Sequence, residues 1–363
     1  MATETVNYQC PNCTGPLKFA GGSGQLECEY CGSKFEVSTV EQFYADKEQA
    51  AASAGADPKW DVSEAGGEWS EEETSHLRAY SCPSCAAELI CDETTAATSC
   101  PYCGNPTVVP GKFTGQLKPD YVIPFKLDRN SAVNALAKYY KGKKFLPKNF
   151  ADANHIEEIR GVYVPFWLFD GESEADMRFS ATKVSTRRSG GYEITDTDHY
   201  RVTREGGVRF EKVPVDGSSK MPDAHMDAIE PFDYGGLKPF STAYLPGYLA
   251  DRYDEDAETC GKRANRRIVE STERAFASTT KGYATLKREY YNINLTYGEV
   301  KYALMPVWML ATRWRNKNFL FAMNGQTGKL IGDLPVDRGK FWGWFAKIAL
   351  PAAAVIAIAL FLL

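Results

Sequence analysis

Apolar and polar residues follow two distinct periods between residues 113 and 335. Alternation or short apolar runs predict strands at 121–127, 161–170, 175–186, 191–203, 207–213, 286–296, 300–314 and 317–323. Apolar residues at helical spacing predict helices at 128–140 and about 254–278. The segment 324–328 is rich in residues that favour a hairpin turn. The pattern therefore predicts an α+β body over 113–335.

This body carries a weak repeat in the order strand, helix, strand and strand. Pro124 lies before the first helix and Pro246 before the second, and a Pro-x-Trp follows each helix at Pro165 and Pro306. The two proline spacings differ, so shared chemistry at strand edges is an alternative explanation. A duplication would divide the body into lobes at 119–215 and 232–335.

The C-terminal segment 341–363 is almost entirely apolar. Its 23 residues would make a helix of roughly 34 Å, enough to cross the hydrocarbon core. Trp342 and Trp344 stand where an aromatic belt is expected, and basic residues precede the apolar run. We expect a single-pass transmembrane helix that places the protein in the cell membrane, with the N-terminal bulk in the cytoplasm. A buried C-terminal helix is the alternative.

Eight of the ten cysteines form two copies of one pattern. Each copy has two Cys-x2-Cys pairs separated by 14 residues, and each cysteine of the second copy lies 72 positions after its equivalent. Two such pairs supply the four corners of a tetrahedral zinc site. The expected ligands of two Zn²⁺ ions, one per ribbon, are Cys10, Cys13, Cys28 and Cys31, then Cys82, Cys85, Cys100 and Cys103.

The ribbons are expected at 1–40 and 76–112, with a flexible acidic linker at 41–75. Redox pairs and disulfides are the alternatives for such cysteines. The first residues have neither the basic end nor the apolar stretch of a secretory signal, which favours a reducing compartment and structural zinc. The linker carries ten acidic and two basic residues, which is typical of a solvated spacer.

Charge argues against a nucleic-acid partner. The chain has a formal net charge of −5, and each ribbon carries about one more acidic than basic residue. Proteins that bind nucleic acid gain much of their affinity from basic contacts with phosphates. A protein partner therefore suits the ribbons better. A nucleic-acid-binding zinc-ribbon protein linked to replication or transcription is the alternative.

The chain lacks the motifs of common catalytic sites. No phosphate loop or nucleophile elbow occurs. Asp196, Asp198 and His199 form a polar cluster that we interpret as exposed surface rather than a metal or acid–base site. Cys91 and Cys260 are expected to be buried small hydrophobic residues. We therefore expect no catalytic residues, no cofactor-binding residues besides the zinc ligands, and no small-molecule substrate.

Longer strings of residues resemble one bacterial family. They are Cys100–Thr107, Val122–Asp128, Gly161–Asp170, Val213–Pro222 and Phe321–Gly328. They are similar to the YdjG-like membrane proteins with zinc ribbons of the TFIIB type, which are often described as relatives of primosomal helicase. The missing phosphate loop and basic groove argue against helicase or transcription activity here.

The resemblance implies a function as well as the eight ribbon cysteines. It implies a membrane-bound scaffold that works in envelope stress beside flotillin-like (SPFH-domain) and phage-shock-protein-A-like proteins. It supplies no catalytic residue. We therefore expect a non-enzymatic adaptor that recruits protein partners and contacts the lipid bilayer through 341–363.

Overall fold

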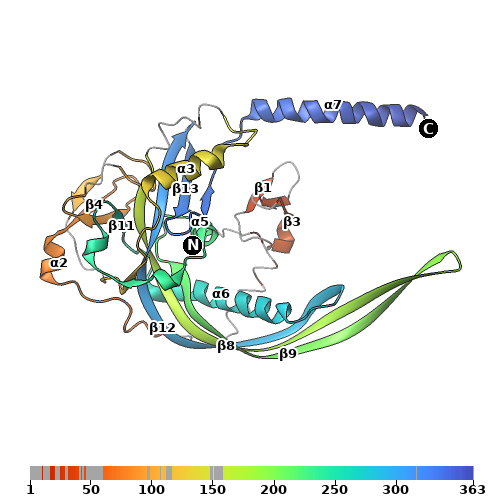
Figure 1. Ribbon diagram of the computed structural model, residues 1–363, viewed down its shortest axis with the longest axis horizontal. Helices are drawn as coiled ribbons and strands as arrows, with labels where there is room; N and C mark the ends of the chain where they lie inside the picture. Colours follow the sequence, from red (N-terminus) through yellow and green to blue (C-terminus); the bar gives the residue numbers. More distant parts are fainter. Residues whose placement is uncertain are drawn as a thin grey trace.

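A long curved sheet dominates the computed structural model (Figure 1). The structure describes residues 10, 17–20, 25–28, 32–40, 42, 45, 60–95, 99–106, 108–111, 117–147, 150, 158–315 and 317–362. Eleven strands join in the large sheet, in the order β10-β7-β12-β8-β11-β5-β4-β6 with β9, β13 and β14 attached beside this path. The expected α+β class is correct for the body.

The strands are β1 (Leu17–Ala20), β2 (Gln25–Cys28), β3 (Lys34–Glu36), β4 (Leu77–Ser81), β5 (Glu88–Asp92), β6 (Val109–Gly111), β7 (Tyr121–Val122), β8 (Arg160–Ser189), β9 (Tyr192–Asp216), β10 (Lys238–Pro239), β11 (Leu249–Asp251), β12 (Thr285–Trp314), β13 (Lys317–Asn324) and β14 (Leu330–Gly332). The helices are α2 (Glu71–Ser75), α3 (Arg129–Tyr140), α5 (Asp223–Ile229), α6 (Ala257–Ser278) and α7 (Arg338–Leu362), with 3₁₀ turns η2 (Tyr234–Gly236) and η3 (Thr242–Tyr244).

Three strands of 25 to 30 residues, β8, β9 and β12, form the curved centre of the sheet. Strands β8 and β9 are joined through Gly190 and Gly191, which both have positive φ angles of 59° and 81°. Paired positive φ angles match the primed turns that close two-residue hairpins. Residues 161–169 of β8 are all buried, buried residues alternate from Ser173 to Ala181, and the hairpin from Lys183 onward is exposed.

Helices α3 and α6 cover one face of the sheet, where their apolar residues enter three hydrophobic clusters. Both helices begin at an aspartate: Asp128 accepts a hydrogen bond from the Ser131 amide, and Asp256 accepts one from the Thr259 amide. Side chains of this kind satisfy amides of the first turn. The opposite face of the sheet carries a fourth cluster, which includes residues of α5 and the turns that hold Cys82 and Cys100.

The order strand, helix, strand and strand occurs twice, as β7-α3-β8-β9 and β11-α6-β12-β13. The short strand of each unit pairs in parallel with the long strand of the other, β7 with β12 and β11 with β8. Pro165 lies opposite Leu304 and Pro306 lies opposite Tyr163, as a twofold relation requires. Both units contribute to one sheet.

The segment leading into the second cysteine group contacts the body at Trp60 and at Gly67. Trp60 is 8% exposed, makes edge contacts with Phe169 and Tyr297, and donates from its indole to Asn265 at 3.1 Å. Gly67 pairs with Lys118. The part of the predicted acidic linker from Trp60 onward is therefore anchored to the body at these points, because burial of the tryptophan stabilises the contact.

Within the part of the chain described, no helix combines the length and the apolar character needed to cross a membrane. The predicted transmembrane helix over 341–363 is therefore wrong, and so is the membrane placement derived from it. Helix α7 does form from Arg338 to Leu362, and Arg338, Lys340 and Lys347 are among its described side chains.

Candidate metal centre

Two tight turns bring four of the predicted cysteines together. In the first turn the Ala86 amide donates to the Cys82 carbonyl at 2.9 Å, and in the second the Gly104 amide donates to the Cys100 carbonyl at 3.0 Å. Ala86 and Gly104 have φ angles of 56° and 70°. The left-handed backbone reverses the chain immediately after each Cys-x2-Cys pair. Both sulfurs of a pair therefore face the same point.

The four sulfur atoms have the spacing of a tetrahedral metal site. The Sγ atoms of Cys82 and Cys103 lie 3.6 Å apart, as do those of Cys85 and Cys100, and all four lie within 4.8 Å of one another. Four sulfurs at about 2.3 Å from a zinc ion would be separated by about 3.8 Å. The residues therefore fit a single metal ion with four thiolate ligands.

The environments of the four thiols differ. Burial alone would raise the pKa of Cys82, but backbone N–H groups of Cys85 and Ser84 bring it down to about 7. Burial raises the pKa of Cys85 to about 11 and also raises the pKa of Cys100. A metal ion would supply the positive charge that holds the buried thiols as thiolates.

The first cysteine group is described only in part. Cys10 and Cys28 are buried, whereas Cys13 and Cys31 lie outside the described residues. The Gly32 amide donates to the Cys28 carbonyl at 2.9 Å, and Gly32 has a φ angle of 73°. The same turn occurs at Cys100. Among the described residues one four-cysteine cluster is complete. The structure therefore supports one of the two expected metal sites.

The complete cluster is part of the large sheet rather than a separate module. Strand β5, which follows the first Cys-x2-Cys turn, pairs with β11, and β11 pairs with β8. Cys82 and Cys100 belong to the same hydrophobic cluster as Met309 of β12. A Cβ atom at Gly104 would lie 3.4 Å from the Ala311 carbonyl oxygen. The turn is therefore docked directly on the body.

A buried polar group lies at this junction. Asp251, at the end of β11, accepts a hydrogen bond from the Ser218 hydroxyl at 2.6 Å. Burial raises the pKa of Asp251 to about 7, although Ser218 and the neighbouring Tyr102 oppose the shift. Tyr102 lies between the second pair of cysteines, so the buried carboxyl adjoins the metal-binding turn.

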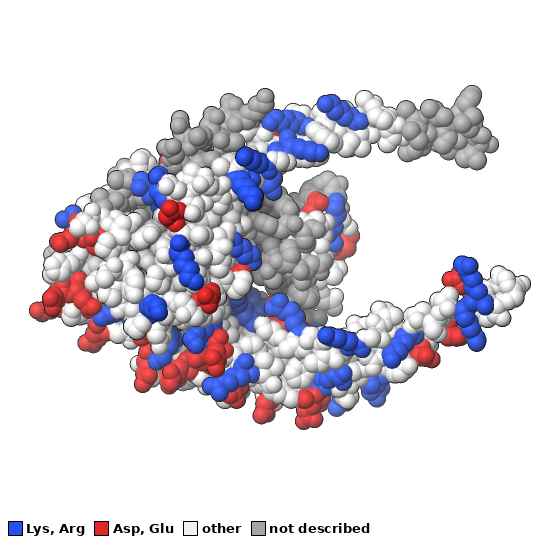
Figure 2. Space-filling view, viewed as in Figure 1, with Lys and Arg blue, Asp and Glu red and all other residues white. Residues whose placement is uncertain are grey.

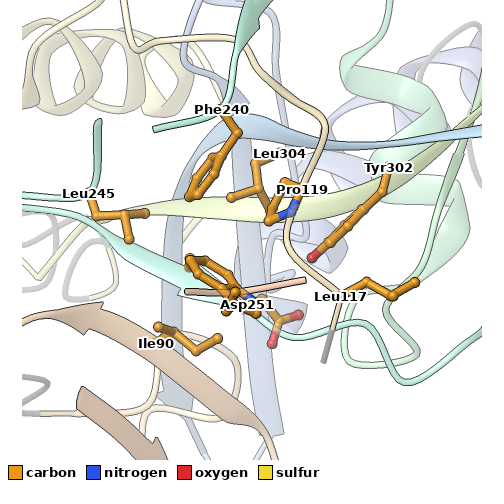
Figure 3. Close-up of a pocket in the computed structure, with 10 residues that line it drawn as sticks. Ile90, Leu117, Pro119, Phe240, Leu245, Asp251, Tyr302 and Leu304 are labelled. Carbon is orange, nitrogen blue, oxygen red and sulfur yellow. The ribbon is translucent and has the colours of Figure 1, made fainter. Parts of the chain in front are cut away.

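A small apolar hollow of about 20 Å³ opens beside the same junction (Figure 3). Ile90 of β5 lies on one side and Phe240 and Leu304 lie on the other, with Asp251 between them. Leu117 at the rim is 38% exposed. Its walls are apolar apart from Asp251, so the hollow and its exposed rim form a small apolar surface.

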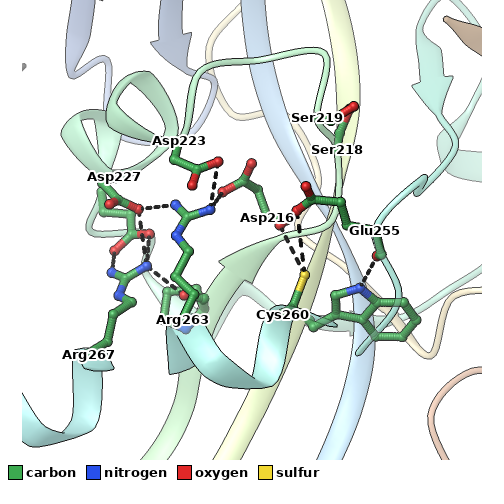
Figure 4. A network of polar contacts seen from close by, with 12 residues as sticks. Asp216, Ser218, Ser219, Asp223, Asp227, Glu255, Cys260, Arg263 and Arg267 are labelled. Carbon is green, nitrogen blue, oxygen red and sulfur yellow. Dashed lines mark hydrogen bonds and ion pairs between the residues drawn. The ribbon is translucent and has the colours of Figure 1, made fainter. Parts of the chain in front are cut away.

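A second polar network holds α6 to the sheet and to α5 (Figure 4). Arg263 forms ion pairs with Asp216 at 2.7 Å and with Asp227 at 2.6 Å. Arg267 pairs with Glu230 and donates to the Pro214 carbonyl at 2.6 Å. The four-residue spacing of the arginines, which places both on one helix face, was the available sequence signal. The carboxylates that pair with these buried arginines lie far away in the sequence, so the spacing alone did not reveal them.

Three predicted surface residues do not converge on a site. Asp196 and Asp198 lie opposite Ser185 and Lys183, whereas His199 lies opposite Thr182. His199 therefore points to the other face of the strand, because side chains alternate along β9. All three residues are exposed.

The two remaining cysteines are buried, as expected. Cys91 is 0% exposed and Cys260 is 3% exposed. The Cys91 thiol donates to the Thr95 carbonyl at 3.0 Å, and burial raises its pKa to about 11. Burial likewise raises the pKa of Cys260. These shifts keep both thiols protonated and poorly nucleophilic at neutral pH.

Comparisons with known proteins found one similarity over nearly the whole chain. A Bacillus subtilis (strain 168) protein described as uncharacterized protein YdjG is 35% identical over 344 residues, which cover 95% of this chain and 94% of that protein. No family model matches the chain, and no solved structure matches it.

Proposed function

Since this chain belongs to the YdjG family, we propose that it is a non-enzymatic, protein-binding adaptor with a structural zinc centre. The closed set of four cysteines carries this proposal. Cys82, Cys85, Cys100 and Cys103 would fill all four positions of a tetrahedral zinc ion, whereas a catalytic zinc keeps one position for water or substrate. Zinc here would stabilise the fold of the 76–112 ribbon.

The surface beside the centre supports a protein partner. The apolar hollow lies between β5 of the ribbon and the body, and Leu117 at its rim is 38% exposed. A few apolar contacts at the centre of a protein interface often provide most of its affinity. A metal that fixes β4 and β5 would keep the hollow in shape. Flotillin-like and phage-shock-protein-A-like proteins are the proposed partners.

The test is a crosslinking experiment in cells, followed by purification of the chain and mass spectrometry of what accompanies it. The informative variant is Leu117→Lys, which places a charge at the hollow without touching a cysteine. Val184→Lys is the matched control, because Val184 is also exposed, at 49%, but lies on the β8–β9 hairpin.

We expect a flotillin-like or phage-shock-protein-A-like protein to be enriched with the unchanged chain and with Val184→Lys, and to fall about tenfold with Leu117→Lys. The double variant Cys82→Ser/Cys85→Ser should lose both the partner and one equivalent of zinc. Recovery of nucleic acid with replication or transcription proteins would contradict the proposal, as would unchanged partner recovery with Leu117→Lys.

A further inference from the structure

Strand β9 leaves one edge of the sheet open. Among the strands that the structure describes, β8 is its sole neighbour, over a ladder from Tyr192 to Asp216. The part from Tyr192 to Phe210 has 19 residues and a length of roughly 60 Å. An edge of this length presents a row of backbone donors and acceptors that another strand can pair with.

The outer part of the hairpin is exposed on both faces. All residues from Lys183 to Arg201 are exposed, and charges of both signs follow one another along the hairpin (Figure 2). Apolar side chains accompany the charges: Tyr192, Ile194 and Tyr200 are 77%, 36% and 39% exposed. Edge strands that stay single are usually protected by charges that repel another strand. Along β9, however, the charges have both signs and need not repel a second strand.

The order of charges along β9 is complementary to itself. We propose that two copies of this chain associate through antiparallel pairing of their β9 edges, with Arg201 opposite Arg201 at a twofold axis. In this register Glu193 lies opposite Arg209 of the second copy, and Asp198 lies opposite Arg204 of the second copy. Symmetry repeats each contact, so four ion pairs form across the junction.

The apolar residues match in the same register. Ile194 lies opposite Val208 of the second copy, and Tyr200 lies opposite Val202 of the second copy. In each pair both residue numbers are odd or both are even. A twofold axis perpendicular to the sheet therefore places the two side chains of each pair on the same face. Aromatic, β-branched and oppositely charged cross-strand pairs each stabilise a sheet.

Neighbouring registers of the two β9 strands form fewer favourable charge pairs. An axis at Val202 places Glu193 opposite Glu211 of the second copy, and an axis at Tyr200 retains one type of ion pair, Asp196 with Arg204. The favoured register has one unfavourable contact, the two arginines at the axis. Like charges directly opposite destabilise a sheet only modestly, and two types of ion pair oppose them.

The first test is disulfide trapping in the full, zinc-loaded chain. Arg201→Cys would place two cysteines directly opposite each other at Cα distances of about 4.5–5.5 Å, within the range of a disulfide. Thr197→Cys is the matched control: it lies on the same face of the same strand, but its two copies would be roughly 26 Å apart. Both variants retain all native cysteines.

We expect mild oxidation to convert most of Arg201→Cys into a covalent dimer and to leave Thr197→Cys monomeric. Equal crosslinking of the two variants, or crosslinking of neither, would overturn the proposed register. Disulfides that form by random collision between molecules would appear in Thr197→Cys as well.

The second test separates charge pairing from folding. Glu193→Arg and Arg209→Glu should each weaken dimerisation about tenfold in sedimentation equilibrium, since each reverses two symmetric contacts. The double variant Glu193→Arg/Arg209→Glu should recover the affinity of the unchanged chain, because the pairs are restored with exchanged signs. A chain that stays monomeric at all concentrations, or a double variant no better than either single one, would overturn the proposal.

Discussion

The two cysteine groups share their spacing but not their surroundings. Strands β1, β2 and β3 form a three-stranded sheet of their own, whereas β4, β5 and β6 continue into the large sheet through β11. Cys28 and Cys100 occupy equivalent positions 72 residues apart and make the same turn. A shared ligand pattern therefore does not determine whether a ribbon is an appended module or a part of the core.

The largest effect should come from equivalent cysteine substitutions. Cys100→Ser should lower the free energy of unfolding of the body by on the order of 5 kcal/mol, because zinc-binding energy is folding energy for the strands joined to β11. Its melting temperature should fall by about 10–20 °C. Cys28→Ser should change the free energy of the main unfolding transition by less than about 1 kcal/mol. Thermal unfolding with zinc analysis measures both, and equal losses would contradict the comparison.

A second prediction concerns the segment that enters the joined ribbon. Trp60→Ala should cost about 3–5 kcal/mol, since it empties a buried site against Phe169 and Tyr297. Trp342, which is 61% exposed on α7, provides the control. Trp342→Ala should change stability by less than about 1 kcal/mol in urea unfolding. Similar costs for the two variants would show that 60–75 does not anchor the ribbon.

The third prediction uses the buried carboxyl at the junction with β11. Asp251 has a pKa near 7 in the folded chain, because of burial, against 3.8 for the unperturbed group. The folded state therefore holds a proton that the unfolded state has released between these two values. As pH rises towards 7, this group should lower the free energy of unfolding by about 1.4 kcal/mol per pH unit. Above pH 7 its contribution should stay constant.

Asp251→Asn removes this titration while keeping an acceptor for the Ser218 hydroxyl. Urea unfolding of the zinc-loaded chain between pH 5.5 and 8 should show the variant gaining about 2 kcal/mol relative to the unchanged chain by pH 7. A pH slope that persists in the variant would place the titrating group elsewhere.

Local patterns predicted the elements better than their connections. The helix expected over 128–140 is observed as Arg129–Tyr140 because the aspartate cap and apolar spacing lie within it. The strands expected at 286–296 and 300–314 are one strand, β12, in which an irregularity between Tyr297 and Val300 interrupts the alternation without ending the ladder. Sequence periodicity does not distinguish a bulge from a strand end.

The cysteine spacing predicted the four-cysteine cluster at 82–103, since bringing four sulfurs together needs only local turns. It did not reveal that Asp251 pairs with Leu89, a contact between segments more than 150 residues apart. Buried partners of Arg263 were missed for the same reason, because its carboxylates come from β9 and α5. Long-range pairing thus decides which ribbon joins the core.

The smallest effect compares the glycines of the two equivalent turns. Gly32 and Gly104 have φ angles of 73° and 70°, so alanine at either position costs about 1 kcal/mol of backbone strain. At Gly32 a Cβ would meet nothing within 4 Å, whereas at Gly104 it would meet the Ala311 carbonyl at 3.4 Å. Gly104→Ala should therefore lower the stability of the body by about 1–2 kcal/mol in urea unfolding. Gly32→Ala should confine its cost to the small β1–β3 sheet and leave the main transition unchanged. If Gly32→Ala instead shifted the main transition as much as Gly104→Ala, the first ribbon would also be joined to the core, and the contrast between the two cysteine groups would disappear.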